Sequence, residues 1–252
     1  MATFSLKTKL GKLIPILFWV LVWQVLALFV GLDLLLPSPV SVGVALWNLL
    51  FDLEFYRGIG FSLAGILSGF FLGVFGGTIL AILSWRSQMV SQLFSPLLRL
   101  MRTAPVASFI ILALLWFGRR TVPMVIAAMM VLPIVTSSTQ TALGQTDKHL
   151  VEMAKAYGFS KWKQIKMLYL PQVLPQWQAA CVVAMGLAWK AGVAAEVIAQ
   201  PNPALGRNLY RARLLLNTPE LFAWTAVVIL LSFLLERLFA KAIGALGKDI
   251  RL

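Results

Sequence analysis

The feature that most constrains this chain is a series of long segments that contain no Asp, Glu, Lys or Arg. A segment of about 20 mostly apolar residues is long enough to cross a bilayer as a helix. The whole chain is 60% apolar and 12% charged, whereas soluble domains are about 45–50% apolar and about 25% charged. The segments are continuously apolar rather than alternating, which argues against membrane strands. We therefore predict an all-α membrane protein with six transmembrane helices, at residues 13–32, 58–85, 103–118, 121–146, 167–189 and 221–235.

Two of these windows are shorter than a full span. The third begins after Arg102 and has 16 residues, so we expect the helix to include residues before that arginine. The sixth has 15 residues and is expected to continue past Glu236 and Arg237, whose long side chains would extend toward the membrane surface. No polar linker divides the chain, so we expect a single transmembrane domain over residues 1–252, with its core at about 58–245.

Residue types that carry most catalytic chemistry are scarce in this sequence. It contains one His and one Cys, which excludes a disulfide framework and a His- or Cys-based metal cluster. The motifs H-E-x-x-H, G-x-S-x-G and the phosphate-binding G-x-x-x-x-G-K-[ST] are absent from the sequence. The sequence therefore predicts no catalytic site, no metal site and no cofactor on this chain.

The charges between the windows predict the orientation of the spans. With the N-terminus in the cytoplasm, thirteen Lys and Arg residues lie inside and six lie outside, and an excess of basic residues marks the cytoplasmic side. We therefore place both termini and the longest loop, residues 145–170, in the cytoplasm. Topology and contact with anionic membrane lipid then account for the net charge of +13, and no basic soluble face suggests binding to nucleic acid.

Four glycines in the second window repeat at intervals of four residues. Residues with this spacing share one face of a helix, and small side chains there let a second helix approach closely. We predict that this face packs against another helix, of this chain or of a second one, through Gly65, Gly69, Gly73 and Gly77.

A short helix is expected outside, between the first two spans. Ser38 followed by Pro39 is a typical helix start. The apolar side chains that follow share one face and would let the helix lie on the outer membrane surface; alternatively, the helix is only a packing element. These side chains are Val40, Val44, Trp47 and Phe51.

Prolines are predicted to interrupt the third span. Pro96 and Pro105 flank Arg99 and Arg102, and each proline removes a helix hydrogen bond. Short spans that prolines interrupt point to a translocation path in transporters, which makes Arg102 and Pro105 candidate pathway residues. In a second interpretation, the two arginines only mark the cytoplasmic end of the span.

The loop at residues 145–170 is expected to contain two short helices. Asp147 can cap the first, which runs to Tyr157, and Gly158 suits the left-handed residue that ends a helix. Ser160 can cap the second, and Pro171 begins the fifth span at a position that needs no N–H donor. Small side chains on the first helix would let it sit deep in the groove of a partner.

The same loop carries a resemblance to a known family. It has E-M-A at 152–154, G at 158 and L-Y-L-P at 168–171, which resembles the EAA loop of ABC importer permeases, E-A-A-x3-G-x9-I-x-L-P. Met153 and Leu168 depart from that pattern but remain apolar. Further segments resemble the branch that includes nitrate, sulfonate, taurine and bicarbonate permeases, with L-P-S-P at 36–39, S-P-L-L at 95–98 and A-W-K to A-A-E within 188–196.

The resemblance implies a type I ABC importer permease of the bacterial plasma membrane. Two permease chains, here expected as a homodimer, would form the pathway, and an extracytoplasmic binding protein would deliver the solute. Two ABC ATPase subunits would dock on the EAA loops and would bind the ATP and Mg. The residues that would couple this chain to the ATPase are Glu152, Ala154, Gly158, Leu170 and Pro171.

Lys190 and Glu196 are candidate pathway residues, because charges within a span usually face a cavity or a partner. Lys190 would attract an anionic solute, such as a sulfonate or nitrate; alternatively, it contacts the carbonyl end of a neighbouring helix. Glu196 would lie at the outer mouth. Arg207, Arg211 and Arg213 in an outer helix could steer anions or dock the binding protein, or could simply be solvated.

Two other functions compete with an ABC permease. A secondary transporter or channel would need no ATPase, and it predicts internal repeats or a selectivity filter, which we do not find. An intramembrane enzyme would need a catalytic set that this sequence lacks. The solute itself is left open between small anions and vitamin precursors.

Overall fold

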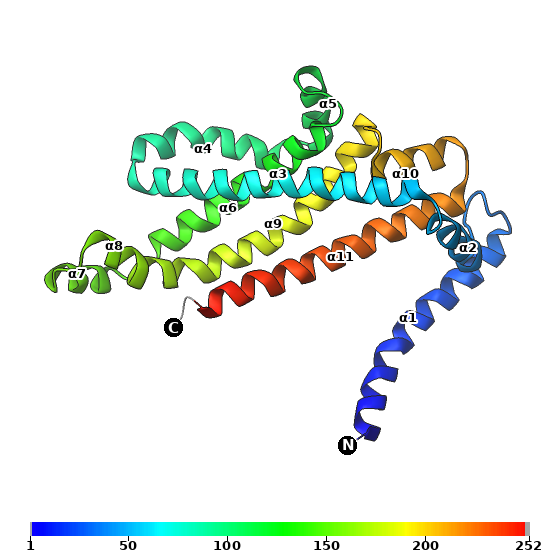
Figure 1. Ribbon diagram of the computed structural model, residues 1–252, viewed down its shortest axis with the longest axis horizontal. Helices are drawn as coiled ribbons and strands as arrows, with labels where there is room; N and C mark the ends of the chain where they lie inside the picture. The colour runs from blue at the N-terminus through cyan, green and yellow to red at the C-terminus, as the bar shows by residue number, and fades with distance from the viewer. Residues whose placement is uncertain (1, 250–252) are drawn as a thin grey trace.

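The computed structural model of the chain describes residues 2–249, with side chains at 14–147 and 149–245, and this part of the chain is helical apart from turns and loops (Figure 1). The all-α prediction is confirmed. In chain order the helices are α1 Ala2–Val30, α2 Pro39–Leu49, α3 Leu53–Arg86, α4 Gln88–Thr103, α5 Val106–Trp116, α6 Val122–Gly144, α7 Lys148–Ala156, α8 Lys161–Gln164, the π-helix η1 Ile165–Tyr169, α9 Leu170–Ala199, α10 Leu205–Leu214 and α11 Thr218–Asp249.

Four long helices form the centre of the molecule. Helix α3 packs along α6, α6 packs along α9, and α9 also contacts α11; all four run lengthwise in Figure 1. Ile66, Phe70, Val131 and Trp189 are almost completely buried between them. Lipid is as apolar as these side chains, so close packing rather than exclusion of water holds such helices together. The positions of the functional groups therefore depend on how well these helices fit.

Glycines allow the closest of these contacts, between α3 and α6. A Cβ atom built at Gly69 would clash with the carbonyl oxygen of Met124 on α6, and those built at Gly73 and Gly77 would lie only 2.6 and 2.8 Å from α6 atoms. Nothing lies within 4 Å of a Cβ built at Gly65. Gly65 does not pack in this way within the chain, because the contact with α6 starts one turn later, and its packing against a second chain stays a prediction.

The lengths and hydropathies of the helices support part of the six-span prediction. Within the described residues, three helices are long and apolar enough to cross a membrane: Leu53–Arg86, Val122–Gly144 and Lys161–Ala199. Helices α4 and α5 make a fourth candidate if the bent pair counts as one span. The predicted first and sixth spans lie in α1 and α11, but the described apolar part of α1, Ile14–Val30, is shorter than 18 residues.

The third predicted span is broken, as expected. Helices α4 and α5 are bent by 112° at residues 104 and 105. Ala104 adopts an extended conformation with φ −74° and ψ 143°, because a residue before proline is disfavoured in the helical region. Pro105 then precedes the first residue of α5.

Helix α2 begins as the sequence predicts. The Ser38 Oγ accepts a hydrogen bond from the Ser41 backbone N at 3.1 Å, and Pro39 is the first helical residue. The helix buries Val42 and Leu49 and contacts α11. The apolar side chains of Val40, Val44 and Trp47 on this helix, and of Phe51 in the turn after it, are exposed.

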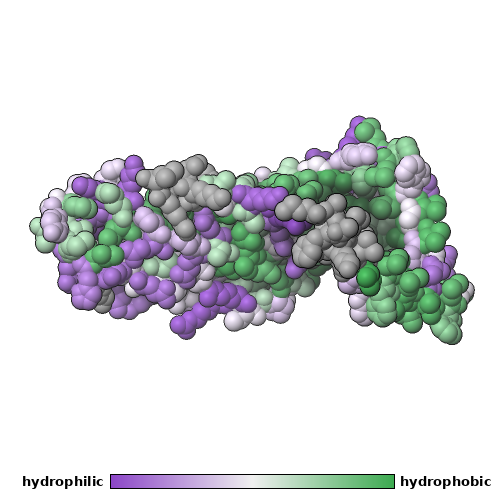
Figure 2. Space-filling model, turned by 90° about the horizontal axis from the view of Figure 1, so that it is seen from below, coloured by the Kyte–Doolittle hydropathy of each residue, from purple (hydrophilic) through white to green (hydrophobic). Residues whose placement is uncertain are grey.

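Helix α1 extends away from the other helices and meets them near its C-terminal end (Figure 1). The Trp23 Nε1 donates a hydrogen bond to the Pro37 carbonyl oxygen at 3.0 Å, and the Trp23 ring stacks on Phe222 at 5.9 Å. Most of the apolar side chains between Ile14 and Leu32 are exposed. Figure 2 shows hydrophobic residues over this half of the molecule and hydrophilic ones toward the end that carries α7 and α8.

One side chain of α11 departs from expectation. Glu236 is half-buried, accepts a hydrogen bond from the Ser232 Oγ at 3.3 Å, and lies against Gly186 of α9. The expectation that Glu236 extends to the membrane surface is wrong, because it lies on the face of α11 that packs against α9. Arg237 is exposed.

Candidate functional site

The predicted loop helices form one end of the molecule (Figure 1). The Asp147 Oδ1 accepts a hydrogen bond from the His149 backbone N at 2.9 Å and caps α7. The Ser160 Oγ accepts one from the Lys163 backbone N at 3.3 Å and caps α8. Both predicted caps are confirmed, and they place the loop helices beyond the ends of α6 and α9.

Gly158 ends α7 in the left-handed conformation, with φ +68°. The Gly158 N donates to the Lys155 carbonyl oxygen at 3.0 Å, and the Phe159 N donates to that of Ala154 at 2.9 Å. These two bonds define a Schellman motif. Nothing lies within 4 Å of a Cβ built at Gly158, so the backbone conformation, and not lack of space, favours glycine here.

The structure places Glu152 and Ala154 on different sides of α7. Ala154 is 3% exposed, so it packs against its own chain, and the expectation that its small side chain inserts into a partner is wrong. Glu152 is exposed and lines a cavity of about 260 Å³ with Trp85 and Lys155. The apolar residues of α7 that are exposed are Leu150, Met153 and Tyr157.

The loop runs into α9 without a break. Ile165–Tyr169 is a π-helical turn in which the Leu170 N donates to the Ile165 carbonyl oxygen. Pro171 has no N–H for the carbonyl four residues earlier, and a π-turn accommodates such a defect. Helix α9 begins at Leu170 with Pro171 in its first turn, as predicted, and the π-turn joins it to the preceding helix, so that the helical segment Lys161–Ala199 is continuous.

The most deeply buried helix, α9, leaves one face uncovered. It packs against α3, α5, α6, α10 and α11. From Pro175 onward its exposed residues nevertheless form one stripe, at intervals of three or four residues. We call this the α9 stripe; it comprises Pro175, Ala179, Val183, Leu187, Lys190, Ala194 and Ile198.

Lys190 provides the only formal charge on the α9 stripe. The side chain is exposed rather than packed between helices of this chain, and its neighbours on the stripe, Leu187 and Ala194, are apolar. An ammonium group in such surroundings is costly within a membrane unless it meets water, a counter-charge or a solute. The stripe is therefore the candidate pathway surface.

Glu196 belongs to the same helix but faces the interior. It is 0% exposed, and its Oε2 accepts hydrogen bonds from the Ser62 Oγ at 2.8 Å and the Gly206 N at 3.0 Å. The Ser62 Oγ in turn accepts one from the Leu205 N at 3.0 Å. The carboxylate thus joins α3, α9 and the start of α10, rather than opening onto a pathway.

We expect the carboxyl of Glu196 to stabilise this junction by accepting hydrogen bonds. Glu196→Leu leaves Ser62 and Gly206 without an acceptor, and each buried orphan group costs about 1–3 kcal/mol. Glu196→Gln keeps an acceptor oxygen, so it should unfold at a higher denaturant concentration than Glu196→Leu in detergent. The exposed Glu54→Leu is the control and should change little. Equal stability of the Gln and Leu variants would contradict the role.

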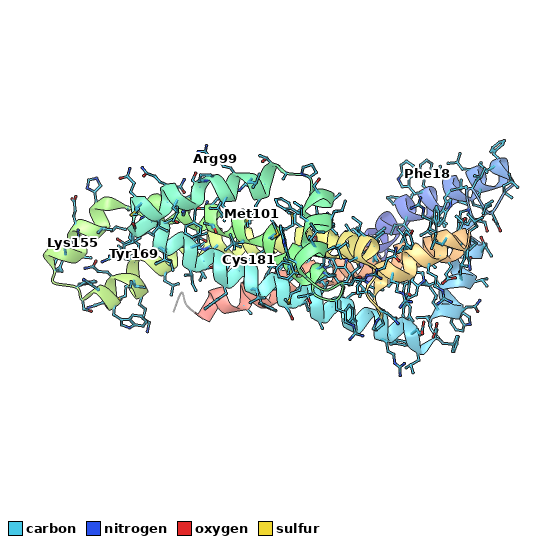
Figure 3. All side chains as sticks on the ribbon, turned by 90° about the horizontal axis from the view of Figure 1, so that it is seen from above. Phe18, Arg99, Met101, Lys155, Tyr169 and Cys181 are labelled. Atoms are coloured by element: carbon cyan, nitrogen blue, oxygen red, sulfur yellow. The ribbon has the colours of Figure 1, made fainter. Side chains whose placement is uncertain are left out.

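The arginines of the third predicted span are separated by the fold. The Arg102 Nη2 donates a hydrogen bond to the Pro133 carbonyl oxygen of α6 at 2.7 Å, so it joins α4 to α6. Arg99 lies on the outer side of α4 (Figure 3), and Pro105 is exposed at the bend. Among the described residues, no hydrogen bond joins Arg102 to Lys190, because the bond that Arg102 makes is the one to Pro133.

Sequence reasoning missed most of the polar contacts between distant segments. Besides the bond of Ser62, these include Trp177 Nε1 to Thr78 Oγ1 at 2.9 Å and Arg120 Nη2 to the Asn202 carbonyl oxygen at 2.8 Å. No local sequence signal marks them, since each depends on packing between helices or loops far apart in the chain. The part of the chain that the structure describes contains no cluster of three His, Cys, Asp or Glu side chains fit for a metal ion.

Comparisons with known proteins bear on what this arrangement does. The profile of the family described as "Binding-protein-dependent transport system inner membrane component" matches residues 69–246. The putative aliphatic sulfonates transport permease protein SsuC of Escherichia coli (strain K12) is 31% identical over 202 residues, covering 79% of this chain and 76% of that protein. The riboflavin transport system permease protein RibX of Chloroflexus aurantiacus is 27% identical, covering 92% and 90%.

One solved structure shares the fold. The crystal structure of an amino acid ABC transporter with histidines contains a chain that matches this protein with a TM-score of 0.59 and 17% identity. The match covers 78% of this chain and 94% of that chain.

Proposed function

We propose that two copies of this chain form the solute pathway of an ATP-driven importer. The premise is that this chain belongs to the family of binding-protein-dependent transport system inner membrane components. The chain is a non-catalytic, multi-pass inner-membrane permease. Such a system also includes an ATPase and a solute-binding protein. The uncovered α9 stripe carries the homodimer proposal, because a pathway needs a face that the rest of the subunit leaves open.

The exposed side of the α7–α8 loop is the surface that we assign to the ATPase. Leu150, Met153 and Tyr157 lie on it, next to Trp162, which is 74% exposed. Four exposed lysines of the same segment suit a partner with acidic residues: Lys155, Lys161, Lys163 and Lys166. Glu152, Gly158, Leu170 and Pro171 would fix the shape of this surface rather than form all of it.

The proposed topology has six spans with both termini and the α7–α8 loop in the cytoplasm. Helices α1 and α11 would supply the first and last spans, supported by their apolar segments. The distribution of basic residues supports the orientation. Helix α2 would then lie on the outer membrane surface with its apolar face toward lipid.

Lys190 favours a small anion as the solute. Relatives named for sulfonates or taurine agree with an anionic solute. Other relatives are named for riboflavin or formylaminopyrimidine, so the names of the relatives do not by themselves identify the solute. An ammonium on the α9 stripe attracts an oxyanion and opposes a cation, and a charged hydrogen bond contributes about 1.5–3 kcal/mol.

Replacing Lys190 tests both the pathway and the charge of the solute. In vesicles that contain the permease, its ATPase and its binding protein, Lys190→Met should lower alkanesulfonate uptake per folded complex by about tenfold or more. Lys190→Arg keeps the charge and should retain much of the uptake. Normal uptake by Lys190→Met would remove Lys190 from the pathway.

A further inference from the structure

A cavity rich in arginine lies at the end of the molecule opposite the α7–α8 loop. It has a volume of about 480 Å³ and lies between the α5–α6 connection, the α9–α10 connection and α10. We call it the arginine pocket; its lining residues are Arg119, Arg120, Gln200, Pro201, Asn202 and Arg207.

One of its arginines is held in place by the fold. The Arg120 Nη2 donates to the Asn202 carbonyl oxygen at 2.8 Å, and its guanidinium lies 5.9 Å from the centre of the Phe61 ring. Arg120 therefore ties the α5–α6 connection to the α9–α10 connection. Arg119 is exposed and Arg207 is half-buried, so these two have donors to offer to a ligand.

Counter-charge is missing from the pocket. None of its described lining residues is Asp or Glu. The nearest acid along the chain, Glu196, is completely buried and accepts hydrogen bonds from Ser62 and Gly206. Three guanidinium groups around one cavity repel each other, and an anion between them removes that repulsion and gains charged hydrogen bonds.

The pocket also adjoins the end of the helix that carries the α9 stripe. Gln200 and Pro201 directly follow the last turn of α9, where the α9 stripe ends at Ile198. Lys190 lies ten residues before Gln200, which corresponds to about 15 Å along a helix. Positive charge therefore occurs at the end of the stripe and again at Lys190.

We infer that the arginine pocket is a binding site for the oxyanion group of the transported solute, at the outer entrance of the pathway. The site rests on the proposed import function and extends it, since it assigns the first contact of the solute with the permease. Arg119 and Arg207 would donate to the oxyanion, while Arg120 keeps the pocket in shape.

Binding of radiolabelled inorganic sulfate to the full-length permease in nanodiscs of zwitterionic lipid tests the site. The double variant Arg119→Gln, Arg207→Gln should lower sulfate affinity by about tenfold or more. The control Arg211→Gln, Arg213→Gln removes the same charge from exposed positions of α10 outside the pocket, and it should stay within about twofold of wild type. Arg120 is left intact because its loss could disturb the fold.

The outcomes separate this site from the import function. Equal losses of sulfate affinity in the two variants, or no saturable sulfate binding by wild type, would overturn the site. Neither result would contradict the import function, because the assay contains no ATPase.

An alternative source of oxyanion is a carboxylate of the binding protein. If raising the binding-protein concentration restores alkanesulfonate uptake to the pocket variant in vesicles, the pocket docks the binding protein and the solute site is overturned. Uptake that stays low at saturating binding protein supports the solute site.

Discussion

Gly69→Ala is expected to remove most of the folded permease. The added methyl group would clash with the carbonyl oxygen of Met124 and lie 2.9 Å from the Cβ of Ala127. Backbone atoms cannot move aside as a flexible side chain can, so α3 and α6 would have to separate. We expect a loss of about 3 kcal/mol, the upper part of the usual range for overpacking.

Gly65→Ala is the matched control for this prediction. It adds the same methyl group to the same helix, one turn earlier, where nothing lies within 4 Å. Alanine is favoured over glycine within a helix by about 1 kcal/mol, so this variant should be as stable as wild type or more so. Denaturant titration of the purified variants in detergent measures the difference, and equal stability of the two variants would contradict the α3–α6 contact.

Gly158→Val is expected to abolish ATP-driven uptake while the protein still inserts and folds. The φ of +68° costs an ordinary L-residue about 1–2 kcal/mol, and a β-branched side chain makes that conformation an outlier. The Schellman motif that turns the chain from α7 to α8 would then open, and the surface assigned to the ATPase would change shape.

The comparison with Gly158→Asn separates conformation from side-chain bulk. Asparagine tolerates the left-handed conformation and replaces glycine at helix ends, so it should retain most of the uptake. Uptake and ATPase copurification are measured for both variants at equal amounts of folded permease. Full uptake by Gly158→Val would show that the shape of this turn does not matter for coupling.

Local signals in the sequence predicted the features that depend on neighbouring residues. The caps at Ser38, Asp147 and Ser160, the left-handed Gly158 and the break at Pro105 all lie where the sequence places them. Each follows from the hydrogen-bonding or steric preference of a residue within its own turn. The resemblance drawn from the loop residues is confirmed by the family match over residues 69–246.

Features that depend on packing between distant segments could not be predicted. Glycine spacing identifies a face of α3 but not where the contact with α6 begins along that face, so it cannot show that Gly65 lies outside this contact. Ser62 and Glu196 are 134 residues apart, and nothing near either one predicts their hydrogen bond. The burial of Ala154 also depends on how α7 packs against the rest of the chain. Sequence patterns indicate which face is small or charged, whereas the fold decides what that face contacts.

Crosslinking from α7 tests most directly the central claim, that the α7–α8 loop couples this permease to its ATPase. Met153 is 50% exposed, and Cys181 is the only cysteine, so Met153→Cys in a Cys181→Ser background provides a single reactive thiol. Trp47→Cys in the same background places the thiol on α2, at the other end of the molecule (Figure 1). In the assembled transporter, a short thiol-to-amine crosslinker should join the permease to the ATPase subunit from position 153 and not from position 47. Crosslinking to the ATPase from position 47 but not from 153 would contradict the account.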